Sequence, residues 1–397
     1  MIIIYHNGKN IIELILDGVT TAIPNLSIVK NVLQLSKNNE NQLLVWCHIN
    51  LKGSLNITEI KNFFHHQKMM LSYHPFQNGY LDKSIGYVEE SVFIKITKSV
   101  TYPTWQMSSC VGAINTTVIN SCSNHIHTND NFDYFLNSFA KLAMPLGLFC
   151  YSEPRLLKGD LEFSANAKPN INEVFKFIKQ HYKTRWIFLL LLDLFLYERK
   201  IPFAAFFRTA FYNKRVFSKS DLDKIEIQTS KKSIVADTID VIIPTIGRKK
   251  YLFDVLKDLA AQTHLPINVI IVEQNPQEES QTELDYLTST TWPFKIKPIF
   301  THQPGACNAR NICLSLVESE FVFFADDDIR IDSKLFENTL RHFDKYGCEI
   351  IQLACLNKND KIIKNHIFQS PFFGAGCSFV KKSSIEGIKF NIAFEFG

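Results

Sequence analysis

Residues 321–332 read FVFFADDDIRID, an apolar run that ends in three consecutive aspartates. The apolar run predicts a buried strand. Because alternate side chains of a strand face the same way, Asp326 and Asp328 share one face while Asp327 faces elsewhere. Paired carboxylates are typical ligands of Mg²⁺ or Mn²⁺, which complete their coordination with water and substrate phosphates. An acidic turn leading into a helix capped by Ser333 is the alternative interpretation.

The stretches on either side of this strand alternate between strand and helix patterns. Short apolar runs predict strands at 239–243, 268–272, 294–300 and 349–354. Helical spacing predicts helices at 249–262, 278–287, from Gly305 onward and at 333–343. Such alternation predicts an α/β fold, a mainly parallel sheet with helices on both faces. Ligands bind at the carboxyl ends of the strands in such sheets, which is where Thr245, Arg248, Glu273 and the three aspartates fall.

Four motifs follow one another in this region. They are VIIPT at 241–245, a strand ending at Glu273, GACNARN at 305–311, and the acidic triplet. In this order and at this spacing they resemble the family 2 glycosyltransferases of the GT-A fold, over residues 237–397. The resemblance implies a Rossmann-like nucleotide-diphospho-sugar transferase fold. It also implies transfer of a sugar, with inversion, from a nucleotide-sugar donor to an acceptor hydroxyl of a cell-surface glycan or lipid-linked precursor.

The resemblance also assigns residues by position. Pro244, Thr245 and Glu273 would line the nucleoside pocket, and Arg310 and Asn311 would organise the donor site. Asp326 would approach the ribose and the metal, and Asp328 would ligate the Mg²⁺ or Mn²⁺ that bridges the diphosphate. We expect the nucleotide-sugar site to comprise Pro244, Thr245, Arg248, Glu273, Arg310, Asn311, Asp326 and Asp327, and the metal ligands to be Asp326 and Asp328.

The general base is the part of the family pattern that this sequence lacks. An acceptor hydroxyl needs a base, which in this family sits in a Glu-Asp or Asp-Asp pair after an aromatic-Gly segment. Here the sequence reads FNIAFEFG at 390–397, with Glu395 as the nearby carboxylate. We therefore expect a C-terminally truncated transferase domain. A catalytically deficient donor-binding or scaffold protein is the alternative. A nucleotidyltransferase would need a Gly-rich basic signature, which PTIGRKK at 244–250 matches poorly.

The N-terminal half carries two segments that echo the last domain. When Cys47 is set against Ala325, residues 48–50 (His-Ile-Asn) stand where the acidic triplet stands, and Gly112 is set against Gly376. We expect a degenerate GT-A-like domain over 1–160, with a strand at 91–96, a helical connector and linker over 161–235, and the transferase domain over 236–397. An unrelated α/β domain is the alternative for the first of these, because strand-helix units recur by chance.

The connector contains WIFLLLLDLFLY at 186–197, followed by a Phe-rich stretch with Arg208, Lys214 and Arg215. Twelve residues are too few for the ~20 that span a bilayer. Interleaved aromatic and basic residues suit a membrane interface. A buried helix with basic ends is the other interpretation, and both stay open.

Composition narrows the class of protein. The chain has 397 residues, a net charge of only +4 and nine Cys without a C-x-x-C pair. These values argue against a nucleic-acid polymer as partner and against a disulfide framework. Cys122, His125, His127 and Asp130 suggest either a metal site or a polar loop, and we favour the loop because a second ligand pair is missing. The N-terminus lacks a signal-peptide pattern. We expect a cytoplasmic protein, with peripheral contact at the inner membrane face left open.

Overall fold

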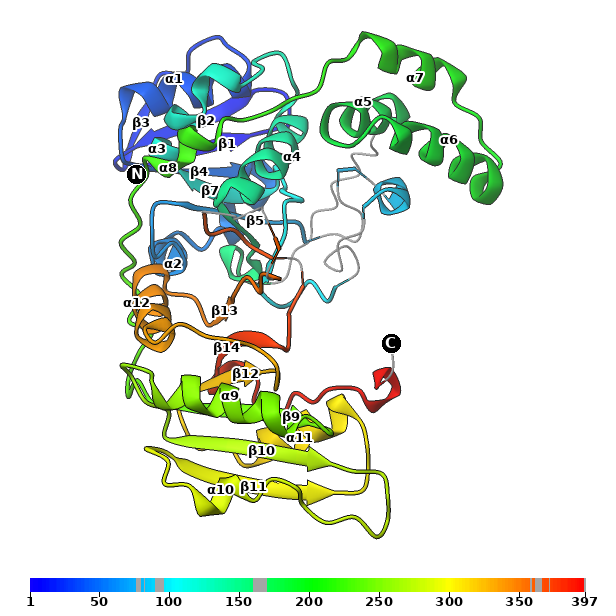
Figure 1. Cartoon of the computed structure of the whole chain (residues 1–397). Coiled ribbons are helices and arrows are strands. Elements are labelled where there is room, and N and C mark those ends of the chain that lie inside the picture. The colour runs from blue at the N-terminus through cyan, green and yellow to red at the C-terminus, as the bar shows by residue number, and fades with distance from the viewer. Residues whose placement is uncertain are drawn as a thin grey trace. The chain divides into compact units, whose positions relative to one another are not determined.

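The computed structural model describes residues 1–75, 80–81, 83–89, 96–159, 170–357, 359–360, 366–370 and 372–395. The chain forms two units, whose elements are labelled in Figure 1. Unit 1 comprises Met1–Ile227 with Lys364–Pro371, and unit 2 comprises Gln228–Ile363 with Phe372–Gly397. Residues 170–227, the described part of the segment expected as a connector and linker, fall within unit 1.

Unit 2 is built on a six-stranded sheet in the order β11-β10-β9-β12-β14-β13. The strands are β9 (Ile239–Thr245), β10 (Asn268–Gln274), β11 (Lys295–Thr301), β12 (Phe321–Ala325), β13 (Ile350–Gln352) and β14 (Cys377–Lys381). The first four in sheet order run parallel, and β14 runs antiparallel to both of its neighbours. Runs of Val, Ile and Phe buried on both faces suit such a sheet. The α/β fold class and its mainly parallel sheet are confirmed.

The register of the sheet brings the ends of three strands to one edge. Glu273 on β10 pairs with Thr245 on β9. Phe324 on β12 pairs with Ile242, so Asp326, two residues further on, follows at the level of Pro244. Parallel neighbours end at the same edge of a sheet. The sequence positions expected to carry chemistry therefore meet at this edge.

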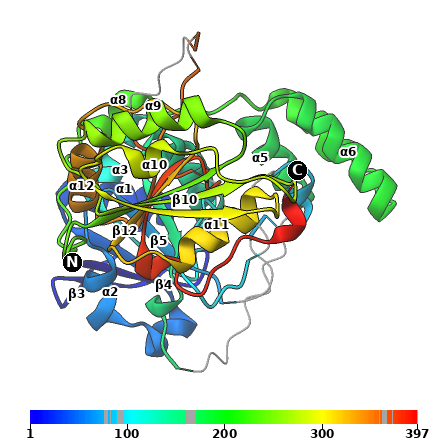
Figure 2. The same cartoon turned by 60° about the horizontal axis from the view of Figure 1, so that its bottom comes forward.

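Helices cover both faces of this sheet. They are α9 (Lys249–Ala260), α10 (Tyr286–Ser289), α11 (Ala306–Ser315) and α12 (Leu335–Tyr346). Val241 and Ile243 pack in one core with α9 and α12, while Ile242 packs in another with Ala309 and Cys313 of α11. Figure 2 shows α9 and α11 on opposite sides of β10. Because successive side chains of β9 point to opposite faces of the sheet, they pack into two separate apolar layers.

Two expected helices of unit 2 differ from the structure. The helix expected at 278–287 is reduced to the short α10, because the preceding loop is held by hydrogen bonds from Thr282 and Glu283 to Glu273. The helix expected from Ser333 begins at Leu335, and Lys334 rather than Ser333 occupies the N-cap position.

Unit 1 is built on an eight-stranded sheet in the order β3-β2-β1-β4-β7-β5-β8-β6. The strands are β1 (Ile2–His6), β2 (Ile11–Leu16), β3 (Val19–Thr21), β4 (Leu43–His48), β5 (Met69–Tyr73), β6 (Tyr102–Pro103), β7 (Val111–Asn115) and β8 (Phe149–Ser152). The helices of its N-terminal part are α1 (Ile28–Asn38), α2 (Ile57–Phe63), α3 (Thr116–Ser121) and α4 (Phe132–Ala143). The strand expected at 91–96 lies, except for residue 96, outside the described residues.

Four strands of unit 1 repeat the pairing of four strands of unit 2. In the run β1-β4-β7-β5, the successive pairs are parallel, antiparallel and antiparallel. The run β9-β12-β14-β13 has the same three pairings. Beyond this run the sheets differ, since β1 has the antiparallel hairpin strand β2 where β9 has the parallel β10. The likeness of the two sheets is therefore partial.

The register of this repeat differs from the alignment expected from sequence. His48 N donates to Cys110 O at 2.7 Å, just as Asp326 N donates to Gly376 O at 3.0 Å. With Cys47 against Ala325, the residue that matches Gly376 is therefore Cys110, and the expected match with Gly112 was wrong by two residues. Gly112 has another role, because a Cβ there would lie 2.2 Å from Cζ2 of Trp46.

The segment expected as a connector packs on the core of unit 1. It forms α5 (Ile171–His181), α6 (Arg185–Glu198), α7 (Phe203–Arg208) and α8 (Lys219–Asp223). Phe175 and Phe177 of α5 are fully buried with Phe135 and Phe139 of α4 in one apolar cluster. This burial explains why 170–227 belongs to unit 1.

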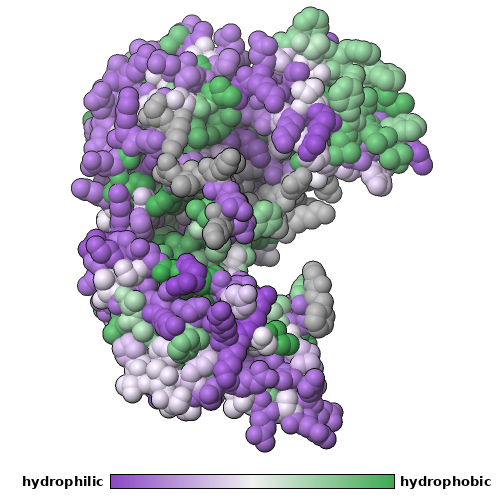
Figure 3. Space-filling model, viewed as in Figure 1, coloured by the Kyte–Doolittle hydropathy of each residue, from purple (hydrophilic) through white to green (hydrophobic). Residues whose placement is uncertain are grey.

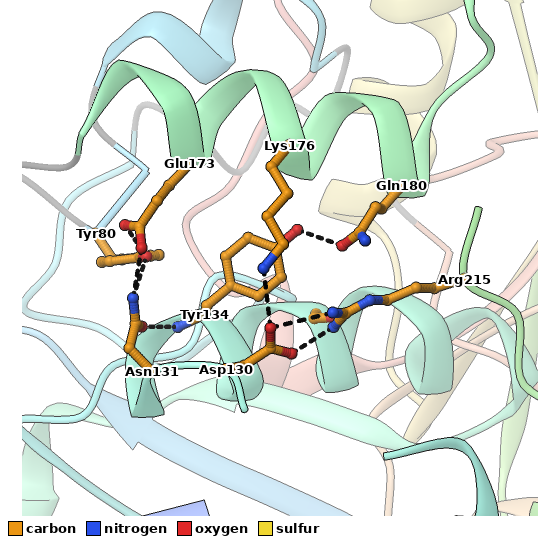
Figure 4. A network of polar contacts seen from close by, with 9 residues as sticks. Tyr80, Asp130, Asn131, Tyr134, Glu173, Lys176, Gln180 and Arg215 are labelled. Atoms are coloured by element: carbon orange, nitrogen blue, oxygen red, sulfur yellow. Dashed lines mark hydrogen bonds and ion pairs between the residues drawn. The ribbon is translucent and has the colours of Figure 1, made fainter. Parts of the chain in front are cut away.

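A polar network fastens the same helices (Figure 4). Asp130, before α4, accepts hydrogen bonds from Lys176 of α5 at 3.0 Å and from Arg215 at 2.6 Å. Tyr134 of α4 donates to Gln180 of α5 at 2.6 Å. Asp130 is thus a structural ion-pair partner of α5 and of Arg215. No group of three or more potential ligands gathers around it within the described part of the chain.

Candidate nucleotide-sugar site

Asp326 directly follows β12, and its carboxylate lies between an arginine and a glycine. Arg310 Nη2 on α11 lies 2.9 Å from Asp326 Oδ1. On the opposite side, a Cβ at Gly376 would lie 2.1 Å from Asp326 Oδ2. The carboxylate therefore occupies space that any side chain at 376 would fill. Asp326 still keeps 44% of its side-chain surface exposed, so it can reach a ligand.

Asp327 points into the protein. Its side chain accepts a 2.6 Å hydrogen bond from Thr245 Oγ1 and a 3.1 Å bond from Arg248 Nη1. Burial raises the pKa of the Asp327 carboxyl, and the bonds from Thr245 and Arg248 oppose that rise. The three residues tie the ends of β9 and β12 together. Asp327 thus has a scaffold position, as the alternation along the strand predicts.

Asp328 lies on the open side of the triplet. Its side chain is 46% exposed, and it pairs with Arg248, which also contacts Asp327. The two carboxylates, Asp327 first, raise the pKa of the Arg248 guanidinium above its usual value. Arg248 consequently stays charged and holds both carboxylates in place. Asp326 and Asp328 are the two members of the triplet that face outward.

The outward pair suits a divalent cation in its chemistry. Carboxylate oxygens are hard donors, and Mg²⁺ sites commonly use one or two of them together with phosphate oxygens and water. Among the residues that the structure describes, no third His, Cys, Asp or Glu joins them in a ready-made cage. Because Gly376 has no side chain, one side of the Asp326 carboxylate stays free of steric hindrance. The residues therefore fit a cation that shares its coordination with a ligand.

Glu273 is nine-tenths buried at the end of β10. It accepts hydrogen bonds from the Thr282 hydroxyl and, at 3.0 Å, from Glu283 N. These bonds fold the loop after β10 back over the strand end. Each carboxylate oxygen has a second lone pair, so Glu273 keeps acceptor capacity beside Thr245.

Asn311 joins α11 to the C-terminal segment. Its amide donates to Phe390 O at 2.9 Å and accepts from Phe390 N at 2.8 Å. Arg310, the preceding residue, lies 5.9 Å from the centre of the Phe390 ring. Asn311 therefore fixes the backbone of Phe390, whose ring lies near Arg310.

Glu395 lies at the N-terminus of α11. Its carboxylate oxygens accept hydrogen bonds from Cys307 N at 2.7 Å and Asn308 N at 2.8 Å. Gly305, at φ 141°, makes room for it, because a Cβ there would lie 2.5 Å from the carboxyl carbon. An acidic group at a helix N-terminus satisfies free N–H groups and opposes the helix dipole. The geometry is that of a helix cap.

Sequence reasoning missed three contributors to the site. Gly376 was noted only as a motif residue, although its lack of a side chain makes room for Asp326. Thr282 lies in a polar loop without a pattern that could mark it. Gln274 accepts a 2.6 Å hydrogen bond from Gly305 N and so links β10 to the start of α11. Of these, only the glycine was singled out in the sequence, where it was set against Gly112.

Unit 2 is thus a mainly parallel α/β sheet with carboxylates and arginines gathered at its carboxyl edge, the edge where ligands bind in sheets of this kind. Residues 240–390 match the model of glycosyl transferase family 2. The expected resemblance to family 2 glycosyltransferases is thus confirmed over these residues.

Named relatives agree with this match. Over 136 residues the chain is 31% identical to an uncharacterized glycosyltransferase of Nostoc sp., covering 34% of this chain and 42% of the relative. Over 131 residues it is 22% identical to the poly(ribitol-phosphate) beta-N-acetylglucosaminyltransferase TarS of Staphylococcus aureus, covering 32% of this chain and 23% of the relative. The chain thus spans less than half the length of these curated relatives.

Solved structures give a more distant likeness. The structure of residues 1–349 of S. aureus TarS with UDP has a TM-score of 0.34 at 19% identity, covering 40% of this chain and 51% of that one. The mannosyltransferase PcManGT from Pyrobaculum calidifontis, in complex with GDP-Man and Mn²⁺, has a TM-score of 0.34 at 14% identity, covering 44% and 53%.

Proposed function

We propose that unit 2 transfers a sugar, with inversion, from a nucleotide-sugar donor to a hydroxyl of a cell-surface glycan or lipid-linked precursor. The observation that carries the proposal is the edge where Asp326 and Asp328 stand half-exposed, held by Arg310 and Arg248. The family 2 match over 240–390 supports the reaction class.

The nucleoside would lie over the ends of β9 and β10. Thr245 and Glu273 are register partners there, and Pro244 precedes Thr245 at the same edge. The Glu273 carboxylate accepts hydrogen bonds and donates none, so it favours a base that offers a ring N–H, such as uracil or guanine. UDP- and GDP-sugars are therefore the donor classes to examine first.

The diphosphate would lie beside the outward carboxylates. Asp326 and Asp328 would hold a Mg²⁺ or Mn²⁺ ion, which when bound neutralises the charge of the departing nucleoside diphosphate. Arg310 adds positive charge on the same side, and its Nε is buried without a hydrogen-bond partner in the described residues. Such an unsatisfied donor costs ~1–3 kcal/mol, which favours a rearrangement of this side chain when an anionic ligand enters.

Proton transfer from the acceptor is not a role that suits Glu395. Its carboxylate oxygens are already engaged by the backbone N–H groups of Cys307 and Asn308 at the start of α11. We assign Glu395 to the capping of α11. This assignment keeps a second candidate function in view, namely donor binding without transfer.

A reducing compartment fits the cysteines. All nine are free thiols in the structure, and disulfides are rare in reducing compartments. We therefore propose a cytoplasmic site of action. No helix in the described parts of the chain has the length and apolar character needed to cross a membrane.

The proposal is tested by donor hydrolysis, which needs no knowledge of the acceptor. The full chain is incubated with Mn²⁺ and a panel of UDP- and GDP-sugars, and release of UDP or GDP is measured. Transferase function predicts release that an Asp328→Asn variant lacks. Binding of a donor without release by the wild-type chain would favour the second candidate.

A further inference from the structure

The outer surface of α6 and α7 is apolar and exposed. Phe188, Leu192 and Phe195 of α6 and Phe203 and Phe207 of α7 are all exposed, as is Phe211, which is 84% exposed. Figure 3 shows these helices as a continuous hydrophobic area of unit 1. We call this the Phe-rich surface. Ten of the thirty exposed large hydrophobic side chains in the described residues lie between 188 and 216.

The helix beneath this surface, α6, is apolar on every side except at Asp193 and at its charged ends, and its apolar residues are fully buried on one side only. Ile187, Leu190 and Leu194 are buried against unit 1. Phe188, Leu192 and Phe195 lie at helical spacing on another face, where each side chain remains 44–59% exposed. Fully burying a side chain of this kind stabilises by ~1.5–3 kcal/mol. A helix that is hydrophobic all round is normally buried, so this face calls for an apolar partner.

Charge identifies the kind of partner. Residues 183–216 contain seven Lys and Arg against two Asp and Glu, an excess of five positive charges, whereas the whole chain has a net charge of only +4. Six of the seven are exposed, and Arg215 is engaged with Asp130 inside unit 1. Lys183 and Arg185 lie at the start of α6, and Arg199 and Lys200 follow its end. The positive charge of the chain is thus concentrated around the Phe-rich surface.

We propose that the Phe-rich surface docks the protein on an anionic lipid bilayer, with α6 and α7 lying in the plane of the interface. Apolar aromatic side chains surrounded by Lys and Arg suit a bilayer surface, where the acyl chains are apolar and the headgroups are negatively charged. With 14 residues, α6 is about 21 Å long against a hydrocarbon core of ~30 Å. Trp186 and the exposed Tyr197 stand near its two ends, where amphipathic rings suit the headgroup level.

The test uses the full chain and large unilamellar vesicles in a flotation assay. Vesicles of 70% phosphatidylcholine and 30% phosphatidylglycerol are compared with pure phosphatidylcholine. The proposal predicts binding to the anionic vesicles that weakens with salt. The double variant Lys183→Glu, Arg185→Glu places acids in the first turn of α6, which favours the helix. It should nevertheless reduce the partition coefficient at least about 25-fold, since each basic residue near an anionic surface contributes about fivefold.

A second variant separates the apolar contribution from the charge. Phe203→Ser, Phe207→Ser, Phe211→Ser changes exposed side chains only, so the fold should persist, and binding should fall by at least about tenfold for each Phe lost. The matched controls are Lys9→Glu, Lys30→Glu, which has the same charge change on exposed residues elsewhere in unit 1, and Val19→Ser, Val235→Ser, at exposed apolar positions. Both controls should bind like the wild type.

Two results would overturn the proposal. One is equal binding of the wild type and both surface variants to anionic vesicles. The other is absence of vesicle binding together with a dimer, seen by light scattering, that the triple Phe variant abolishes. That second result would assign the Phe-rich surface to a second copy of this chain.

Discussion

Arg310 Nη2 on α11 lies 2.9 Å from Asp326 Oδ1 at the end of β12. This ion pair joins the helix of the Gly-x-x-x-Ala-Arg-Asn motif to the strand of the acidic triplet. Asp326 is half-exposed, so water reaches it, and such pairs contribute little to folding. The pair is better explained as preparation of a charged site than as a stabilising contact.

Replacement of Arg310 tests that explanation. In Arg310→Ala, affinity for the bound nucleotide sugar should fall at least about tenfold, because a charge-assisted contact is lost. The free energy of unfolding should change by only ~1 kcal/mol. Titration calorimetry and urea unfolding measure the two quantities. Arg341→Ala, which removes an exposed pair with Glu337 on α12, is the control. Unchanged donor affinity in Arg310→Ala would contradict a donor-site role.

Gly376→Ala tests the space reserved for Asp326. Its Cβ would lie 2.1 Å from Asp326 Oδ2, so the carboxylate must move. We expect loss of Mn²⁺-dependent donor binding and a destabilisation of ~1–3 kcal/mol. Gly374→Ala is the matched control in the same loop, because its Cβ would meet only the end of the flexible Gln352 side chain. Equal binding by the two variants would show that the position of Asp326 is unimportant.

Thr245→Val tests the anchoring of Asp327. Valine keeps the shape of the side chain and removes the donor of the 2.6 Å bond, leaving a buried carboxylate oxygen unsatisfied. We expect a loss of ~1–3 kcal/mol in the stability of unit 2, measured by hydrogen exchange of amides in β9 and β12. Thr245→Ser retains the hydroxyl and should lose much less. If the serine and valine variants are equally destabilised, packing rather than the hydrogen bond anchors the strand end.

His181→Leu tests the pH dependence of unit 1. Burial, with Arg215 and Lys141 nearby, lowers the pKa of His181 to about 3, and both ring nitrogens lack hydrogen-bond partners in the described residues. Below pH 6.5, His181 is therefore protonated in the unfolded chain but stays neutral in the folded chain. The free energy of unfolding consequently falls as the pH falls. Between pH 6.5 and 5, the free energy of unfolding of His181→Leu should therefore fall by ~2 kcal/mol less than that of the wild type.

The measurement for His181→Leu is urea unfolding at pH 6.5 and pH 5, compared with the wild type. His342→Leu, at an exposed position on α12, is the control and should leave the pH dependence unchanged. A wild-type pH dependence in His181→Leu would show that this buried imidazole is not the group responsible.

The carboxyl edge of unit 2 could be predicted because its signals are local. Each strand is a short apolar run with a polar residue at or next to its end, such as Thr245, Glu273 or Asp326. Alternation along β12 was enough to separate the inward Asp327 from its neighbours. The helix at 278–287 was not predictable in this way, because Glu273 draws Thr282 and Glu283 into a loop through tertiary hydrogen bonds.

Unit 1 shows where local patterns stop being sufficient. The match of Cys110 to Gly376 depends on a ladder hydrogen bond to His48, and a shift of two residues preserves the apolar alternation, so the sequence alone does not fix it. The pattern at 170–227 indicates helices, but which faces pack on α4 depends on distant residues such as Phe135 and Asp130. The strand register and the packing of these helices are both decided by contacts between residues far apart in the sequence.

The central proposal is a nucleotide-sugar site that shares a divalent cation with Asp328. Isothermal titration of the full chain with UDP- and GDP-sugars, with and without Mn²⁺, tests it most directly, using Asp328→Asn and the exposed control Asp344→Asn. We predict binding by the wild type and Asp344→Asn that strengthens with Mn²⁺. In Asp328→Asn, affinity in Mn²⁺ should fall at least about tenfold, to the metal-free value. Unchanged Mn²⁺-dependent affinity in Asp328→Asn would contradict the proposed site.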